Sequence, residues 1–228
     1  MDFENELISG VLIKRYKRFF VDIKLKDKTI TAHCPNPGSM FRLLDKGNRV
    51  WITKSNNEKR KLKYTLQIIE VNKIKFCINT HISNKIVKEA IEKKTIYDLK
   101  DYNLIRAEKK FGKNTRFDFL LYNKKNKKKS FLEVKSVSLM RKKGHAEFPD
   151  SVTTRGKKHL ESLMIAHKQG YESHLIFLIQ IEKCKSFGIA SDIDPGYYDL
   201  LKIALKKNVK VLCYDCKFSN KGIEINKE

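Results

Sequence analysis

Long apolar runs are missing from this sequence. No stretch approaches the roughly 20 apolar residues that a membrane-spanning helix needs, and the opening MDFENELISG is acidic, without the charged-then-apolar layout of a signal peptide. The sequence thus lacks the usual signs of membrane insertion and of secretion, so we expect a cytoplasmic protein. With 228 residues, of which 41% are hydrophobic, the chain can form one large domain or two modest ones.

Cysteine is also sparse, with five residues at irregular spacings. An odd number without a regular pattern argues against a disulfide framework and is typical of reduced thiols. Cys213 and Cys216 form a C-x-x-C pair, but no second pair stands at the spacing of a zinc site. Two interpretations stay open: Cys213 ends a buried strand, or the pair has a metal or redox role.

Acidic residues are in short supply. The chain has 26 Asp and Glu against 49 Lys and Arg, a formal net charge of +23. Such an excess predicts a polyanionic partner, because basic surfaces gain affinity by releasing counterions from phosphate backbones. The many Lys, Asn and Ile residues are also typical of an AT-rich genome, which is the alternative explanation. A membrane surface is a weaker candidate, since no basic amphipathic helix with an aromatic face is present.

Residues 10–80 are predicted to form a β-barrel, within a first domain at residues 1–81. Short β-prone runs such as TITAHC and NRVWITK alternate with turn sequences such as PNPG and DKGN. About five short strands, rich in basic and aromatic residues, favour a Greek-key barrel of the OB type, a frequent platform for nucleic acids.

The stretch LIKRYKRFF interleaves basic residues with aromatic ones. This combination is typical of a surface on which a nucleic-acid strand binds and stacks. The alternative is an outer barrel strand whose charges serve solubility. The candidate DNA-binding residues here are Lys14, Arg15, Lys17 and Arg18.

Residues 82–228 are expected to form a second domain of α/β type. A helical stripe begins near residue 83, with Ser83 or Asn84 expected as its N-cap, and later strands such as HLIFLIQI and VKVLCYD are continuously apolar. Asp194-Pro195 predicts a helix start, with Asp as the N-cap and Pro at the first helical position. Apolar strands that follow helices indicate parallel strands covered on both faces. Together with an antiparallel hairpin, they predict a mixed sheet.

Residues 117–137, FDFLLYNKKNKKKSFLEVKSV, are predicted to form that hairpin, with its turn at 123–128. If Tyr122 faces Lys129 across the ladder, then Asp118 lies opposite Glu133, where like charges are destabilising. Lys135 shares the face of Glu133, because side chains two apart in a strand point the same way. Two carboxylates and one ammonium therefore converge.

This convergence predicts a divalent metal site. Mg²⁺ or Mn²⁺ takes carboxylate oxygens and water as ligands, so two carboxylates suffice. Such an ion polarises a phosphodiester and activates water, while a lysine stabilises the charge that develops. Glu108, in the preceding element, is either a third carboxylate of the site or a salt-bridged surface residue. The alternative for the whole cluster is an exposed hairpin in which Lys135 neutralises the acids.

A helix is predicted over about 151–169. Arg155, Lys158 and His159 fall on one polar, basic face, which suits phosphate because the helix N-terminus adds its dipole and free N–H groups. The alternative is a solvated face. Val152 and Leu160 are expected to point elsewhere, into the core.

Six stretches stand out, and they span nearly the whole chain: LIKRYKRFFVD (12–22), HCPNPGSM (33–40), FGKNTRFDFLL (111–121), FLEVKSVSL (131–139), FPDSVTTRGKKHL (148–160) and IDPGYYDLL (193–201). Together, and in this order, they resemble the sugar fermentation stimulation protein A family. The order helix, strand, hairpin with D…E-x-K, helix, strand is similar to the PD-(D/E)XK nuclease-like superfamily. Two departures from the family's pattern are Pro37, where the family usually has Thr, and Phe117, where it often has Ile.

The resemblance implies an OB-like N-terminal domain and a restriction-endonuclease-like C-terminal domain. It also implies DNA binding with little sequence preference and a regulatory role in sugar (maltose) metabolism. By motif position, Asp118 and Glu133 match the metal carboxylates, Lys135 the catalytic lysine, and Glu108 the upstream glutamate.

Two hypotheses stay open. One is a DNA-binding protein that contacts phosphates through both domains, without a helix-turn-helix or zinc finger for base readout. The other is an active Mg²⁺- or Mn²⁺-dependent DNA endonuclease, in which Asp118, Glu133 and Lys135 are catalytic. The sequence does not fix the oligomeric state, and a homo-oligomer is among the alternatives.

Overall fold

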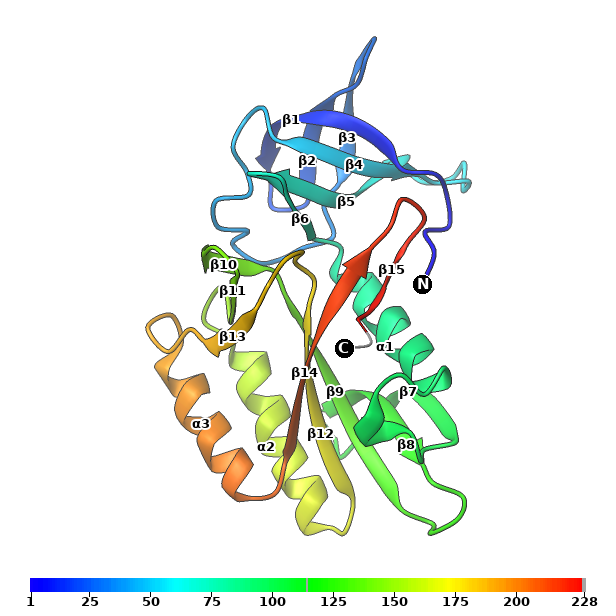
Figure 1. Ribbon diagram of the computed structural model, residues 1–228, viewed down its shortest axis with the longest axis vertical. Coiled ribbons are helices and arrows are strands. Elements are labelled where there is room, and N and C mark those ends of the chain that lie inside the picture. The colour runs from blue at the N-terminus through cyan, green and yellow to red at the C-terminus, as the bar shows by residue number, and fades with distance from the viewer. Residues whose placement is uncertain (114, 227–228) are drawn as a thin grey trace.

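The computed structural model describes residues 1–113 and 115–226. Figure 1 shows a small β-barrel joined to a larger domain in which helices flank a sheet. The predicted fold class is thereby confirmed: an OB-like barrel is followed by a domain with a mixed sheet. Among the described residues, no helix has the length and apolar character needed to cross a membrane.

The barrel closes through a parallel contact between His33 and Thr65. Its interior is apolar because alternate residues of each strand point inward, and Leu12, Val21 and Ile52 are fully buried. The strands, in the sheet order β3-β2-β1-β4-β5-β6, are β1 (Ile8–Tyr16), β2 (Phe20–Lys24), β3 (Thr29–His33), β4 (Arg49–Lys54), β5 (Tyr64–Val71) and β6 (Ile74–Cys77).

The second domain is built on a six-stranded sheet in the order β15-β14-β12-β9-β8-β7. The central strands β9, β12 and β14 are parallel, as predicted, and the outer neighbours are antiparallel. The strands are β7 (Leu104–Phe111), β8 (Thr115–Tyr122), β9 (Lys129–Val137), β12 (Glu172–Ile179), β14 (Lys210–Phe218) and β15 (Ile223–Ile225).

Helices cover both faces of this sheet (Figure 1). Helix α1 (Ser83–Glu92) packs on one face, and α2 (Thr154–Lys168) and α3 (Pro195–Lys206) pack on the other. Alternate residues of β12 enter the two cores: Leu175 lies with α2 and α3, whereas Ile176 lies with α1. Two short 3-10 turns, η1 (Thr80–Ile82) and η2 (Tyr97–Leu99), flank α1.

The predicted helix starts are close to the observed ones. Asp194 caps α3 by accepting a hydrogen bond from the Tyr197 N–H at 3.0 Å, and Pro195 opens the helix as expected. Helix α2 begins a few residues after its predicted start, because Thr153 is its N-cap and accepts from the Gly156 N–H at 3.0 Å. Val152, which we expected in the core, precedes this cap and is 66% exposed.

A small three-stranded sheet was not predicted from the sequence. It contains β10 (Leu139–Lys142), β11 (His145–Phe148) and β13 (Ser186–Ile189), in the order β10-β11-β13. Each strand has only four residues, and β13 joins from a distant part of the chain, so no local pattern marks it. The sheet lies beside the barrel (Figure 1).

The barrel and the second domain are joined by backbone hydrogen bonds. The Cys77 N–H donates to the Gln180 carbonyl at 2.9 Å, and the Glu182 N–H donates to the Lys75 carbonyl at 2.9 Å. Residues near the start of the chain also reach the second domain, where the Phe3 N–H donates to the carbonyl of Lys221 at 2.8 Å. The two domains therefore share a continuous junction.

Candidate active site at the domain junction

The β8–β9 hairpin has the predicted register, with Tyr122 opposite Lys129. The paired ladder ends one step before Asp118 and Glu133. There, Oδ2 of Asp118 accepts a hydrogen bond from the Val134 N–H at 2.8 Å, so the carboxylate itself links the two strands. The two acids lie on neighbouring strands at the point where backbone pairing stops.

Glu133 is the centre of the cluster. Its side chain is buried, and Oε1 accepts hydrogen bonds from Lys135 Nζ at 2.7 Å and from His159 Nδ1. Burial alone would raise the pKa of Glu133, but the Lys135 ammonium and the His159 hydrogen bond outweigh it and lower that pKa. Glu133 is therefore held as a carboxylate. Its second oxygen, Oε2, is buried and has no hydrogen-bond partner among the described residues.

Asp118 is in a different electrostatic state. Besides the bond from Val134, its Oδ1 accepts from Asn84 Nδ2 at 2.8 Å. Burial and the nearby Glu133 carboxylate raise the pKa of Asp118 to about 6, despite these hydrogen bonds. Two neighbouring carboxyl groups with pKa values displaced in opposite directions are typical of functional sites.

Glu108 lies across from Asp118 in the β7–β8 ladder, because the pairs on either side of it stay in register. It has a φ of 54°, in the left-handed region. Non-glycine residues in that region cluster at functional sites. Its exposed side chain lies 3.6 Å from Arg116 Nη1 and lines the same cavity as Asp118 and Glu133. The salt bridge that the sequence raised for Glu108 is thus present, and its role as a third carboxylate of the site stays a prediction.

The donor set fits a hydrated divalent cation. Glu133 contributes a buried, unpartnered oxygen, and Asp118 contributes a carboxyl group whose ionisation the neighbouring negative charge opposes. A cation would relieve both conditions. Within residues 1–113 and 115–226, no three His, Cys, Asp or Glu side chains are grouped as a ready metal cage. An ion such as Mg²⁺, which keeps several waters, needs only one or two carboxylates.

A cavity of about 640 Å³ surrounds the cluster, and both domains line it. The barrel contributes Arg18 and Asn36, and α2 contributes Arg155. Asn36 is 3% exposed, and its Nδ2 donor has no partner among the described residues. A buried, unused donor in a cavity lined by arginines is suited to bind an oxygen of an anionic ligand.

The loop that carries Asn36 is held in place by two arginines that the sequence analysis predicted to bind DNA. Arg15 Nη2 donates to the Asn36 carbonyl at 2.8 Å, and Arg18 Nε donates to the Pro37 carbonyl at 3.0 Å. Lys14 lies 3.9 Å from Asp22, and Lys17 is exposed. The structure therefore brings Arg18 to the cavity, whereas Arg15 positions its wall.

The predicted basic face of α2 is divided between two environments. Arg155 and Lys158 are exposed, but His159 is only 6% exposed and contacts Glu133. The helix can pack closely against α3 because Gly156 has no side chain: a Cβ there would lie 2.8 Å from the Thr153 side chain and 3.1 Å from the Tyr197 ring. This packing brings His159 down to the cluster.

Asn84 is a site residue that sequence reasoning considered only as a helix cap. It lies in the first turn of α1, where its side chain donates a hydrogen bond to Asp118 on strand β8. No local pattern distinguishes it from a cap, because the contact depends on how α1 docks on the sheet. The C-x-x-C pair contributes nothing to the cluster: all five cysteines are free, and Cys213 is exposed whereas Cys216 is buried on the other face of β14.

The fold defines a two-domain protein in which an OB barrel precedes a mixed-sheet domain with an acidic hairpin. Two family models match in the same order: the SfsA N-terminal OB domain over residues 13–78 and the sugar fermentation stimulation protein RE domain over residues 81–222. The chain belongs to the sugar fermentation stimulation protein (SfsA) family.

Individual relatives agree over nearly the full length. The sugar fermentation stimulation protein homolog of Pelagibacter ubique is 51% identical over 100% of this chain and 97% of its own. That of Pseudoalteromonas atlantica is 42% identical over 99% of this chain and 97% of its own. A solved structure of Pyrococcus furiosus SfsA, in complex with Ca²⁺, superposes with a TM-score of 0.89 at 24% identity, covering 99% of this chain and 95% of that one. At 24% identity, this structural similarity supports the fold alone.

Proposed function

We propose that the protein binds DNA with little sequence preference and hydrolyses its phosphodiester bonds with the help of a divalent cation. The observation that carries this proposal is the Asp118–Glu133–Lys135 cluster in a cavity that both domains line. A protein that only binds gains nothing from carboxylates beside phosphate, unless a cation inverts the local charge. The net charge of +23 supports a polyanionic substrate.

Asp118 and Glu133 would hold the cation, which supplies Lewis-acid polarisation of the phosphate when bound. The Ca²⁺ in the Pyrococcus furiosus structure supports a hard divalent ion, and we expect Mg²⁺ or Mn²⁺ to sustain activity here. Lys135 donates to a phosphate oxygen and stabilises its developing negative charge. His159 keeps Glu133 oriented, and Asn36 and Arg18 bind the substrate from the barrel side.

The Asp118→Asn variant tests this function. Cleavage of single-stranded, duplex and branched DNA should require Mg²⁺ or Mn²⁺, stop with a chelator, and fall by at least about 100-fold in the variant. DNA affinity should stay the same or rise, because one negative charge is removed. Asp27→Asn, on an exposed barrel loop, is the matched control and should cut normally.

Two outcomes would contradict the proposal: no cleavage by the wild type on any of these substrates, or equal cleavage by Asp118→Asn. The Glu133→Ala variant, which removes the second carboxylate, should also abolish cleavage. Glu108→Gln should have a smaller effect, since its carboxylate is exposed and paired with Arg116. The regulatory role in maltose metabolism stays a prediction, and a dependence of DNA affinity on maltose would support it.

A further inference from the structure

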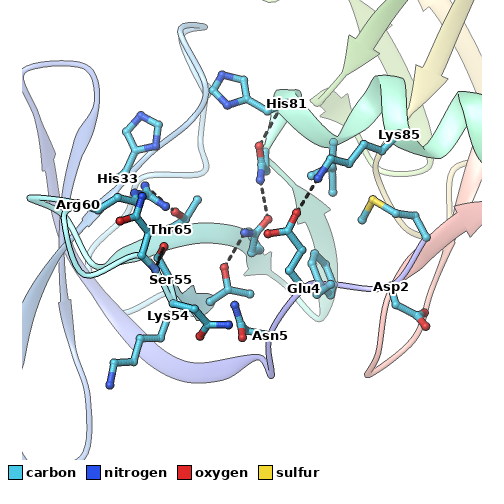
Figure 2. Close-up of a pocket in the computed structure, with 18 residues that line it drawn as sticks. Asp2, Glu4, Asn5, His33, Lys54, Ser55, Arg60, Thr65, His81 and Lys85 are labelled. Carbon is cyan, nitrogen blue, oxygen red and sulfur yellow. Dashed lines mark hydrogen bonds and ion pairs between the residues drawn. The ribbon is translucent and has the colours of Figure 1, made fainter. Parts of the chain in front are cut away.

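A second cavity, of about 610 Å³, lies between the barrel, the N-terminal segment and the start of α1 (Figure 2). The segment 79–85 is the wall between it and the candidate active site. His81 borders both cavities. In the same segment Asn84, which binds Asp118, faces the active-site cavity, and Lys85 faces the second one.

Cationic and ring side chains gather at one end of this second cavity. The rings of His33 and His81 lie 6.2 Å apart, and Figure 2 shows Arg60 beside His33. Arg60 Nη2 donates to Thr65 Oγ1 at 3.2 Å, which holds the guanidinium at the cavity wall. Burial, together with the charges of His81 and Arg60, lowers the pKa of His33. An anion placed there would offset this positive field.

A line of buried amides fixes the geometry of the cavity floor. Asn79 Nδ2 donates to Gln67 Oε1 at 2.7 Å, and Gln67 Nε2 donates to Thr53 Oγ1 at 2.9 Å. Asn79 Oδ1 accepts from the His81 N–H at 3.0 Å, so the same line holds the backbone of His81. Buried, satisfied polar groups thus hold the backbone from which His81 projects.

Acidic side chains line the cavity as well, but at its other end. Asp2 and Glu4 come from the N-terminal segment, and Glu4 forms an ion pair with Lys85 at 2.7 Å (Figure 2). The charges are therefore separated: Arg60 and His33, both from the barrel, lie away from Glu4 (Figure 2), and His81 lies beside His33. A ligand with one anionic group and one neutral, planar group matches this distribution.

We propose that this cavity binds one nucleotide unit of a single nucleic-acid strand, whose adjacent part lies in the active-site cavity beyond His81. The inference rests on the proposed function. Cavities of about 300–1,000 Å³ hold small organic ligands, so a nucleotide unit fits where a duplex does not. Arg60 and His81 bind the phosphate. The base contacts His33, whose ring also lies 6.3 Å from the ring of Phe19, as in other stacking platforms.

The Arg60→Ala variant tests the subsite, by fluorescence anisotropy of a labelled ten-nucleotide thymidine strand in chelator. We expect its affinity for the strand to fall about tenfold, and the slope of log K against log salt to shrink by about 0.7. Affinity for a duplex should change by less than about twofold. Lys59→Ala, which removes the same charge from the same loop outside the cavity, is the matched control and should behave as wild type.

Lys54 is an exposed residue that also lines this cavity. The Lys54→Ala variant should therefore weaken strand binding as well, and it provides a second test if Arg60→Ala lowers the melting temperature. The subsite is wrong if Arg60→Ala and Lys54→Ala bind the strand as tightly as Lys59→Ala does. That result leaves the proposed function standing, provided Asp118→Asn still abolishes cleavage. Displacement of the strand by thymidine monophosphate at equal concentration would instead assign the cavity to a free nucleotide. Absence of any DNA binding by the wild type would overturn both proposals.

Discussion

Two histidines in this protein are buried, and their surroundings give them opposite roles. His159 contacts a carboxylate in the candidate active site, whereas His174 lies 15 residues later in the interior of the sheet. His174 Nδ1 is 2.6 Å from Ser130 Oγ, and its Nε2 has no partner among the described residues. Burial, and then the charge of Lys210, lower the pKa of His174 from 6.5 to about 4. This residue therefore affects how stability depends on pH.

Acid should destabilise the protein through His174. Between pH 6.5 and about 4, the unfolded chain binds a proton that the folded chain does not, so folding free energy present above pH 6.5 is lost as the pH falls. The loss should reach about 3 kcal/mol near pH 4. Urea unfolding at pH 7 and pH 4.5 measures it. His174→Gln should reduce the difference. Equal pH dependence in the wild type and the variant would contradict this role.

At the scale of elements, helix α2 shows how one small residue determines the position of a side chain in the candidate site. Its close contact with α3 occurs at Gly156, where the Thr153 cap and the Tyr197 ring leave no room for a Cβ. Glycine is usually unfavourable inside a helix, by about 1 kcal/mol relative to alanine. Here that propensity is outweighed by packing, because the helix could not otherwise present His159 to Glu133.

Gly156→Ala should therefore destabilise the fold by about 1–2 kcal/mol, the cost of overpacking minus the gain in helix propensity. Thermal unfolding would measure it, and cleavage should fall with the displaced His159. Gly196→Ala is the matched control: its added Cβ would meet Lys157 Nζ at 3.4 Å, an end that can move, so it should be neutral or stabilising. A stabilised Gly156→Ala variant would show that the helix contact is not tight.

The hairpin was predictable because its determinants are local. The lysine-rich turn fixes the register, the register pairs Asp118 with Glu133, and the two-residue period of a strand adds Lys135. His159 was not predictable as a partner of Glu133, since a histidine among Arg155 and Lys158 has the pattern of a solvated face. Its burial follows from the packing of α2 on strands β8 and β9, where its ring lies 6.4 Å from the ring of Phe117, a residue some forty positions away in the chain. The role of Asn84 and the small β10-β11-β13 sheet could not be predicted for the same reason.

At the scale of the whole molecule, Gln180 connects the two domains. Its Oε1 accepts hydrogen bonds from Ser83 Oγ at 2.6 Å and from Ser136, and its Nε2 lies 3.2 Å from Cys77 Sγ. The side chain is fully buried. One amide thus joins the last barrel strand, the start of α1 and strand β9, three elements that converge behind the candidate site.

Gln180→Ala should cost about 2–4 kcal/mol, because it opens a cavity and leaves one buried and one half-buried hydroxyl group without their acceptor. Unfolding should also become less cooperative, with the barrel and the mixed-sheet domain melting at separate temperatures in calorimetry. Gln169→Ala, at the exposed end of α2, serves as the control and should leave a single transition. A single unshifted transition in Gln180→Ala would show that the backbone contacts alone hold the junction.

The wall at residues 79–85 has a thermodynamic consequence. One short segment faces both cavities, so a ligand that shifts it from one side alters the pocket on the other side. Linkage then requires reciprocity: the factor by which a bound strand changes cation affinity equals the factor by which the cation changes strand affinity. Titrating each ligand in the presence of the other would yield one coupling constant, and substitutions in this wall would change both affinities together.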